Sequence, residues 1–197
     1  IARNEEDRIG KALESVARVA GEIIVVDTGS SDTTKTIARN HGALVVDAPW
    51  QDNFSLARNC AIEQASSDWI LMIDADESLA PGQEKRLTRL VSDSLKEAWF
   101  VQIRSPLAGR QKGQVFVHAL PRLFRNRRDY RFRGRVHEQI HESLYEANAV
   151  IGHSDLLLEH SGYALSQQFR HEKLLRNLEL LQLDLEDDPS NALALYH

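Results

Sequence analysis

The sequence predicts an α/β protein with a mostly parallel sheet and helices on both of its faces. Short apolar runs, such as EIIVVD at 22–27 and WILMI at 69–73, have the composition of strands that are buried on both sides. Amphipathic stretches separate these runs, and strand and helix alternate three times. This alternation favours right-handed crossovers between parallel strands.

The first half of the chain supplies these elements in a regular order. Residues 5–19 have a helical period, because Ile9, Leu13 and Val16 recur with charged residues between them. The predicted elements that follow are a strand at 22–27, a helix at 31–41, a strand at 43–47, a helix at 54–65, a strand at 69–73 and a helix that begins after Pro81 and runs to about Ser94. Gly42 suits the left-handed conformation that often follows a helix.

Before the first helical stretch, Ile1 and Ala2 are the residues that could belong to a strand. The first strand of a doubly wound sheet usually lies in the middle of that sheet. We therefore expect the central strand to precede Ile1 and to be missing from the sequence, which would then be a segment of a longer protein.

Beyond residue 94 the pattern changes to short β-rich segments. They lie at 98–103, 114–120, 122–126, 130–136 and 156–160. Their alternation of apolar and polar residues is loose, so their ends are set only to within a few residues. We expect them to form a smaller antiparallel region that packs against one end of the parallel sheet.

The C-terminal part of the chain has a helical pattern. Leu174, Leu178, Leu181 and Leu185 recur at spacings of four, three and four, which indicates a helix that packs on a neighbour. Pro189 ends this helix, and a second helical pattern begins after it. The predicted organisation is therefore one α/β domain at 1–163 and C-terminal helices at 164–197.

The composition indicates an ordinary soluble protein. Of its 197 residues, 42% are hydrophobic and 27% are charged, and no apolar run is long enough to span a bilayer. A single cysteine, Cys60, excludes an intramolecular disulfide and fits a reducing compartment. The net charge of −5 argues against nucleic acid as a partner, although residues 104–135 are strongly basic. We expect a cytoplasmic protein, with a peripheral position at the inner face of the membrane as the alternative.

Acidic residues follow the predicted strands. The run WILMIDADES at 69–78 passes from apolar residues to three acids in four positions, and DTGSSD and DAPW follow the strands at 22–27 and 43–47. Side chains two apart in an extended chain point the same way, so Asp74 and Asp76 are expected side by side. A hard divalent cation with oxygen ligands would relieve their repulsion. An acidic turn is the alternative for each motif alone, but several acids at one sheet edge indicate a ligand site.

Three stretches in this order resemble the nucleotide-sugar-binding half of glycosyltransferase family 2, which has the GT-A fold: RNEEDRIGKALESV, EIIVVDTGSSDTT and FSLARNCAIEQASSDWILMIDADE. The resemblance covers roughly residues 1–165. The later stretches PRLFRNRRDYRFRGRVHEQI and HSGY resemble a bacterial subgroup in which this domain precedes tetratricopeptide repeats. Residues 171–197 resemble the lead-in helix and first helix of such a repeat array.

The resemblance implies a metal-dependent transferase that inverts the anomeric centre. Its donor would be a nucleoside-diphosphate sugar, in most cases UDP-linked, and its acceptor a glycan, a lipid-linked molecule or a protein. Arg3, Asn4 and Glu5 match the edge that lines the nucleotide, Asp27 matches the acid that accepts a hydrogen bond from the base, and Arg58 matches a basic residue near the nucleotide. The repeats would offer a surface for protein partners.

The resemblance also implies a Mg²⁺ or Mn²⁺ site. Asp74 and Asp76 match the Asp-x-Asp signature, with Asp74 near the ribose and the sugar and Asp76 on the metal that bridges the diphosphate. Both acids are candidate ligands, together with His160 of LLLEHSGY, for which a buried structural histidine is the alternative. A hard cation would neutralise the charge that develops on the departing diphosphate.

Glu138 in GRVHEQI is the candidate general base for the acceptor, with Asp129 as the second choice. The alternative for Glu138 is an ion pair with a nearby arginine. The arginines of the basic stretch, Arg122, Arg125, Arg127 and Arg128, either face a phosphate or decorate a solvated hairpin. HEQIH at 137–141 does not have the order of a zinc-protease motif.

Two other functions fit part of the pattern. A nucleotidyltransferase also places acids and Mg²⁺ at the end of a parallel strand, but its glycine-rich phosphate loop is not seen in the sequence. A repeat-bearing scaffold with a degenerate transferase domain is the other alternative. The presence of Asp27, Asp74 and Asp76 argues against it.

Overall fold

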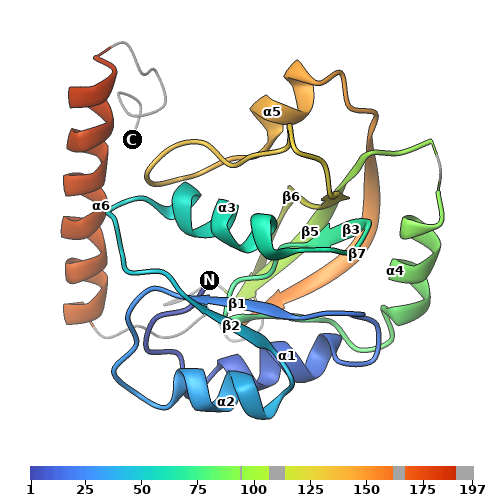
Figure 1. The fold of residues 1–197 in the computed structure, drawn as a ribbon, viewed down its shortest axis with the longest axis horizontal. Helices are drawn as coiled ribbons and strands as arrows, with labels where there is room; N and C mark the ends of the chain where they lie inside the picture. Colours follow the sequence, from blue (N-terminus) through green and yellow to red (C-terminus); the bar gives the residue numbers. More distant parts are fainter. Residues whose placement is uncertain (94, 107–113, 162–166, 190–197) are drawn as a thin grey trace.

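The computed structural model describes residues 1–93, 95–106, 114–161 and 167–189, and within the last stretch it describes the side chains of residues 171 and 174–189. The protein contains two sheets with helices around them (Figure 1). The mixed α/β class that the sequence predicts is confirmed.

A small parallel sheet contains the first two strands, β1 (Ile24–Asp27) and β2 (Leu44–Asp47). The two strands end together, because Asp27 pairs with Asp47. Helices α1 (Ile9–Val16) and α2 (Thr34–Asn40) pack beside this sheet through a cluster that contains Leu13, Val25 and Ala38. The parallel direction predicted for the strands at 22–27 and 43–47 is confirmed.

The second sheet has five strands in the order β3-β6-β5-β7-β4. Their bounds are Trp69–Leu71 for β3, Glu77–Leu79 for β4, Ala98–Pro106 for β5, Val115–Arg125 for β6 and Ile151–His160 for β7. Strand β5 pairs antiparallel with β6 and parallel with β7. The predicted antiparallel region is therefore larger than expected and includes the third strand of the chain.

That third strand differs most from its prediction. The run at 69–73 predicts a central parallel strand, but β3 has three residues and pairs antiparallel with β6, where Trp69 lies opposite Arg125. The reason is that the predicted segments 114–120 and 122–126 form one long strand, whose end supplies the partner for β3. A hydrophobic run indicates burial, but it does not identify the strand that pairs with it.

The long strand β6 contains a bulge at Arg122. Trp99 of β5 lies opposite Leu123, whereas the next residue, Phe100, lies opposite Pro121, so Arg122 is an extra residue on β6. Proline is tolerated at a bulge because the ladder hydrogen bonds are interrupted there. A bulge also redirects a side chain, and Arg122 is buried, with 7% of its surface exposed.

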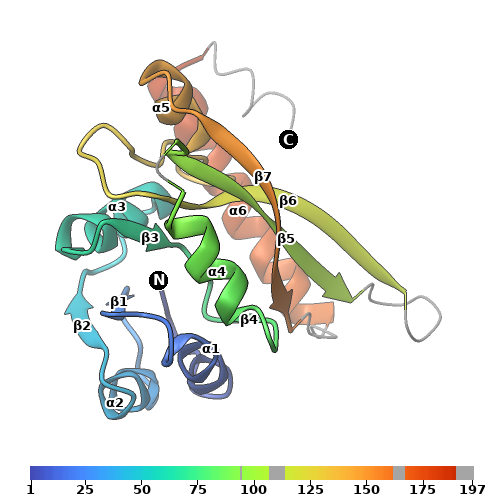
Figure 2. The same ribbon diagram turned by 90° about the vertical axis from the view of Figure 1, so that its right-hand side faces the viewer.

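Helices cover both faces of the five-stranded sheet (Figure 2). On one face, Val16 of α1 and Leu87 of α4 (Glu84–Val91) pack on Trp99 and Val101. On the other face, residues of α3 (Phe54–Gln64) and α5 (His141–Glu146) pack on Phe124. Asn53 caps α3 by accepting a hydrogen bond from the Leu56 amide at 3.0 Å.

The predicted strand at 130–136 is wrong. These residues form a loop whose backbone makes one isolated bridge, between Arg133 and Gln139. The aromatic residues that suggested a strand, Tyr130 and Phe132, are instead buried in the core beside α3 and α5. β-Propensity measures the fit of a side chain to a half-buried surface, and a core loop offers the same environment.

Helix α6 (Gln167–Asp187) stands at the edge of the molecule (Figure 1). The predicted leucine stripe makes contact only in part, because Leu181 is buried while Leu174 and Leu178 are 57% and 45% exposed. Residues 190–197, where a second helix is predicted, lie outside the described part of the chain. The repeat region therefore stays a prediction. Among the described residues, none of the helices has the length and apolar character needed to cross a bilayer.

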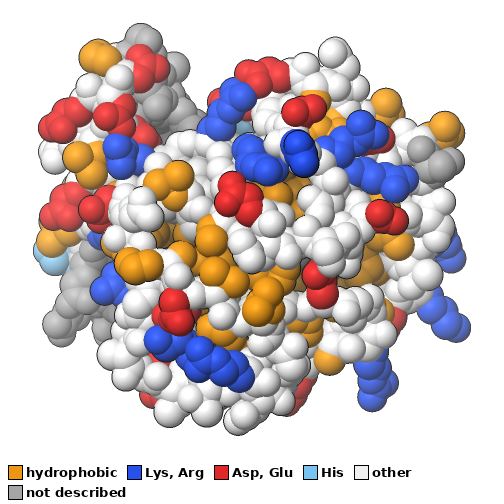
Figure 3. All heavy atoms as spheres, viewed as in Figure 1, with side chains coloured by type: hydrophobic (Ala, Val, Ile, Leu, Met, Phe, Trp, Pro, Cys, Tyr) orange, Lys and Arg blue, Asp and Glu red, His pale blue; other side chains and the backbone are white. Residues whose placement is uncertain are grey.

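A cavity of about 400 Å³ lies between β1 and β3. Its lining is mostly apolar and includes Val25, Ile70 and Met72. Figure 3 shows apolar side chains gathered between α3 and β1 on this face. Ala2 lies beside the cavity and pairs with β1, because its amide donates to the Val26 carbonyl at 2.9 Å. The expectation of a strand before Ile1 stays a prediction.

Candidate functional site

Asp27 ends β1 and is almost completely buried, with 1% of its surface exposed. Its Oδ1 accepts hydrogen bonds from the amides of Gly29 and Ser30, at 3.0 and 2.9 Å. Gly29 has a φ of +113°, a backbone conformation that is unfavourable for any residue with a side chain. Among the described residues, Oδ2 of Asp27 has no hydrogen-bond partner. The turn therefore fixes the carboxylate with one oxygen bound by backbone amides and the other, Oδ2, buried without a partner among the described residues.

The segment Arg3 to Glu5 lies against the same turn. The amide of Asn4 donates to Ser30 Oγ at 2.9 Å, and the Asn4 side chain accepts from the Ser31 amide at 2.9 Å. The Glu5 amide donates to Thr34 Oγ1 at 2.7 Å. Arg3 is exposed at this edge. The structure thus brings together two segments that the sequence predicts to line a nucleotide, 26 to 29 residues apart in the chain.

Asp74 and Asp76 lie in a turn rather than on an extended strand. Strand β3 ends at Leu71, and the Glu77 amide donates to the Asp74 carbonyl at 2.9 Å to close the turn. The prediction that the two acids stand side by side on a strand is therefore wrong in its geometry. Each carboxylate binds different partners, so the two acids need not share one role.

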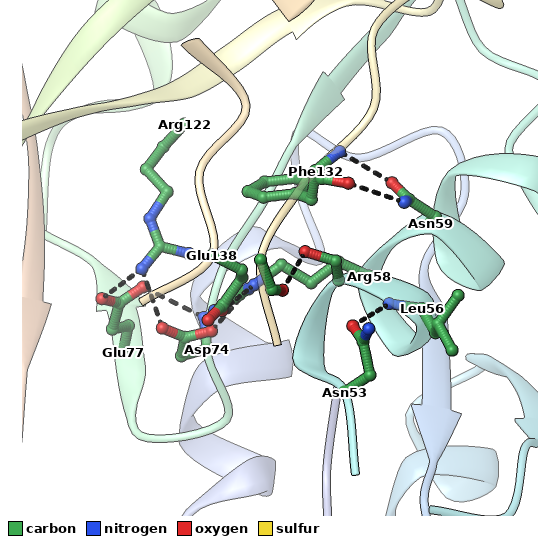
Figure 4. Close-up of polar contacts among 11 residues, drawn as sticks. Asn53, Leu56, Arg58, Asn59, Asp74, Glu77, Arg122, Phe132 and Glu138 are labelled. Carbon is green, nitrogen blue, oxygen red and sulfur yellow. Dashed lines mark hydrogen bonds and ion pairs between the residues drawn. The ribbon is translucent and has the colours of Figure 1, made fainter. Parts of the chain in front are cut away.

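Two buried arginines hold the Asp74 carboxylate (Figure 4). Nη1 of Arg58, on α3, lies 2.7 Å from Oδ1, and Nη2 of Arg122, at the β6 bulge, lies 2.8 Å from Oδ2. Burial alone would raise the pKa of Asp74, but Arg122 and Arg58 hold it well below its ordinary value. Asp74 is therefore an anion whose two oxygens both have cationic partners in this structure.

Glu77 joins this group although the sequence analysis gives it no role. It is 4% exposed, its Oε2 accepts from the Asp74 amide at 3.0 Å, and its Oε1 lies 3.4 Å from Arg122 Nη2. Burial raises the pKa of Glu77, and Arg122 acts against that rise. The available signals were the acid at the third position after Asp74 and the proline just before Arg122, which marks a bulge.

Arg58 also binds Glu138 on the other side of its guanidinium group. Nε of Arg58 lies 2.6 Å from Glu138 Oε1, and the Glu138 side chain is 11% exposed. One arginine thus connects Asp74 with Glu138 (Figure 4). The sequence offers an ion pair with a nearby arginine as the alternative for Glu138. An ion pair is observed, but the arginine is Arg58 of α3, 80 residues away in the chain, and the contact places Glu138 inside the site. Asp129 is exposed in the turn after β6.

Asp76 points toward the end of β7. His160 Nε2 lies 3.0 Å from Asp76 Oδ2, and Arg8 Nη1 lies 3.9 Å from the same oxygen. The hydrogen bond to Asp76 raises the pKa of His160, although burial acts in the opposite direction. These two side chains are brought together from positions 84 residues apart, as the sequence analysis expects for a shared ligand.

The acids and His160 supply two donor atoms that a cation could use. Across the described part of the chain, no group of three or more His, Cys, Asp or Glu side chains is arranged to hold a metal ion. Asp76 and His160 supply an oxygen and a nitrogen within 3.0 Å of each other, and Asp74 is engaged by arginines. Mg²⁺ is often held by one or two carboxylates together with phosphate oxygens and water. The role of Asp74 as a metal ligand stays a prediction.

The other arginines of the basic stretch lie away from these acids. Arg125 stacks over the Trp69 ring, with its guanidinium carbon 4.5 Å from the ring centroid. Arg127 pairs with Glu97 at 2.6 Å, and Arg128 is exposed. Of the four arginines, Arg122 alone contacts Asp74 in the described structure.

Comparisons with known proteins agree with the resemblance. Residues 1–151 match the family model described as glycosyl transferase family 2. The chain is 37% identical over 197 residues to a TPR repeat-containing protein of Synechococcus elongatus, covering 95% of this chain and 48% of that protein. It is 32% identical over 196 residues to the SPbeta prophage-derived glycosyltransferase SunS of Bacillus subtilis, covering 97% of this chain and 45% of that protein. The chain thus spans about half the length of these relatives.

A solved structure has a similar fold. It is glucosyl-3-phosphoglycerate synthase from Mycobacterium tuberculosis in complex with Mn²⁺, UDP and glucosyl-3-phosphoglycerate. The TM-score is 0.58 at 16% sequence identity, and the match covers 94% of this chain and 76% of that one. The similarity confirms the GT-A fold that the sequence resemblance implies.

Proposed function

Because the chain belongs to glycosyltransferase family 2, we propose that it transfers a sugar from a UDP-linked donor to an acceptor with inversion of the anomeric centre. Family membership favours glycosyl transfer over the nucleotidyltransferase and scaffold alternatives. The observation that carries the proposal is the bridge formed by Arg58, which connects the donor-side acid Asp74 with the candidate base Glu138.

The donor nucleotide would bind at the edge formed by β1 and the segment Arg3 to Glu5. Asp27 supports this position, because its Oδ2 is buried and has no partner among the described residues, as expected for an acceptor that faces a base N–H. A structure of similar fold contains UDP. Recognition of uracil by Asp27 and contact of Arg3, Asn4 and Glu5 with the nucleotide are parts of this proposal.

Asp76 and His160 would hold the divalent cation, Mg²⁺ or Mn²⁺. When bound, such a cation supplies positive charge that stabilises the departing diphosphate. The protein contributes the orientation of its ligands, since the Asp76 carbonyl accepts hydrogen bonds from the amide and hydroxyl of Ser161, at 2.8 and 2.9 Å. Mn²⁺ in a structure of similar fold supports this assignment.

Glu138 would accept the proton of the attacking acceptor group. The contact with Arg58 uses Oε1 of Glu138 and leaves Oε2 for the acceptor proton. The guanidinium group keeps the carboxylate in one place, and Asp74 keeps the guanidinium group in place from the other side. Such positioning of a base contributes to catalysis because the reacting groups meet in a productive geometry.

The Glu138→Gln variant tests the proposal. It keeps a hydrogen-bonding side chain of the same size but removes the base, so we expect UDP binding to persist and turnover to fall on the order of 10² to 10⁴ fold. UDP release from a panel of UDP-sugars, with water or added glycans as acceptor, measures turnover. Asp129→Asn tests the second candidate base, which is exposed in the turn after β6, and should keep full activity. Unchanged turnover of Glu138→Gln would remove Glu138 from this role.

The proposal also covers the C-terminal region, the acceptor and the location of the protein. The name of one relative, a TPR repeat-containing protein, supports the proposal that residues 164–197 begin a tetratricopeptide-like region with a surface for protein partners. The acceptor is proposed to be a glycan, a lipid-linked molecule or a protein. A cytoplasmic location, or a peripheral one at the inner face of the membrane, completes the proposal.

A further inference from the structure

The loop of residues 133–139 carries Glu138 and has an unusual backbone. Its two ends are joined by hydrogen bonds between Arg133 and Gln139, at 2.9 and 3.0 Å. Within it, Gly134 has a φ of +92° and His137 a φ of +54°. Positive φ is unfavourable for a residue with a side chain, so the loop needs contacts from its surroundings to keep this conformation.

Helix α3 holds one side of the loop. Ser55 Oγ donates to the Gly134 carbonyl at 2.6 Å, and the Phe54 amide donates to the Arg135 carbonyl at 2.8 Å. Arg58, one turn further along α3, then binds Glu138. These contacts place the loop against the helix that also carries the partner of Asp74.

Helix α6 also holds the loop. The carboxylate of Asp184 accepts from the Arg135 amide, with Oδ1 and Oδ2 at 3.3 and 3.2 Å, and also lies 3.7 Å from Arg135 Nε. Val136 is 5% exposed and packs on Leu180 and Leu181, which are 2% and 9% exposed. The two loop residues that α6 contacts, Arg135 and Val136, immediately precede His137 and Glu138 in the chain.

We propose that α6 completes the active site by holding this loop, and that Asp184 is the positioning residue through which α6 fixes Glu138. The helix lies at 167–187, beyond the residues 1–151 that match the family model, so this role is not assigned by family membership. The inference rests on the proposed role of Glu138 as the base. Helix α6 packs on Val136 and accepts a hydrogen bond from the Arg135 amide. These are the two residues that precede His137, which has the positive φ.

The test compares Asp184→Ala with Glu186→Ala, an exposed acid on the same helix, in the full chain. Loss of the Asp184 carboxylate should release the Arg135 amide and displace Glu138, and a small displacement of a catalytic group lowers the rate strongly. We expect kcat for UDP release to fall about tenfold, with the KM for the UDP-sugar and the Kd of UDP unchanged. Hydrogen exchange of the amides at 133–139 should become faster. Glu186→Ala should change none of these quantities.

Asp184→Asn provides a milder variant with a remaining carbonyl acceptor, and it should restore part of kcat and of the protection from exchange. It also keeps the test informative if Asp184→Ala does not fold. Unchanged exchange at 133–139 in both variants would overturn the proposal. Faster exchange with unchanged kcat would overturn it too, because the loop would then be held without effect on Glu138. Failure of the proposed function is recognised separately, by full activity of Glu138→Gln.

Discussion

Arg58 and Arg122 are buried side chains whose charges are balanced by acids from other parts of the fold. Their partners are Asp74, Glu77 and Glu138, which come from a turn, a strand and a loop. The attraction between buried charges compensates for their loss of hydration only when the charged groups are close and their hydrogen bonds are well aligned. The removal of one member therefore affects both the stability of the fold and the orientation of the remaining members.

The first prediction at this scale concerns Arg122→Met. The change leaves Glu77 buried without its cation, and removal of one partner of a buried ion pair costs about 3–5 kcal/mol. The double variant Arg122→Met/Glu77→Gln should lose less stability than the sum of the two single changes. Urea unfolding of all three variants measures the coupling. Arg128→Met, at an exposed position, is the control and should stay within about 0.5 kcal/mol of the parent. Additive losses would show that the two residues are not coupled.

The second prediction concerns the cation. UDP with Mn²⁺ should raise the melting temperature more than UDP alone, because a ligand that binds only the folded state stabilises it. Asp76→Ala should abolish the additional shift caused by Mn²⁺ while the shift caused by UDP alone remains. Glu63→Ala, at an exposed position of α3, is the control acid. A Mn²⁺ shift that persists in Asp76→Ala would exclude Asp76 as a ligand.

At the scale of helices and strands, the packing between β5 and β7 limits which residue can stand at position 152. A Cβ atom at Gly152 of β7 would lie 2.4 Å from Cζ3 of Trp99, whose side chain is buried in the core. The close approach requires glycine at this position, since the ring belongs to the cluster that joins the sheet to α1 and α4.

We therefore expect Gly152→Ala to destabilise the fold by about 1–3 kcal/mol through overpacking. Thermal unfolding measures the loss, and the near-UV circular dichroism of the tryptophans should change with it. Gly21→Ala is a matched control, because no heavy atom lies within 4 Å of a Cβ placed there. An equal melting temperature for the two variants would contradict the packing argument.

Elements with a clear local pattern were predictable, and elements defined by distant partners were not. The helix at 54–65 and the strands at 22–27 and 43–47 follow from periodicity and apolar runs, and the structure contains all three. The run at 69–73 predicts a central parallel strand, but β3 pairs antiparallel with β6, since strand pairing depends on segments far apart in the sequence. Residues 130–136 were assigned the wrong conformation because their aromatic side chains are buried in a loop.

The candidate site shows the same division. Asp27 and the segment Arg3 to Glu5 come together as expected, because both follow from the ends of predicted elements. The role of Glu77 and the choice of Arg122 among four arginines depend on a bulge and on side-chain packing, and Pro121 and the spacing of the acids at 74–77 are local signals that do not name the partners.

At the scale of the whole molecule, a cavity separates β1 from β3. Apolar walls on both sides and the pairing of Ala2 with β1 predict that an apolar strand before Ile1 would run parallel to β1 through the cavity. The two strands that border it would then belong to one continuous sheet, as the predicted doubly wound arrangement requires.

A chain extended before Ile1 by six Val, Ile and Thr residues tests this prediction. We expect a gain in stability of at least about 2 kcal/mol, because burial of a single large apolar side chain contributes about 1.5–3 kcal/mol. The binding of an apolar fluorescent dye should fall as the cavity fills. An extension of six Gly and Ser residues is the control. Equal stability of the two extended chains would show that the cavity does not accept a strand.

The bridge formed by Arg58 also limits how such a protein can diverge. A lineage that replaces Glu138 by a neutral residue leaves the buried guanidinium group of Arg58 with one of its two acidic partners, and a lineage that replaces Asp74 leaves it with the other. Descendants that lose one of these acids should therefore also have replaced Arg58, so that the three positions are inherited or lost as a set.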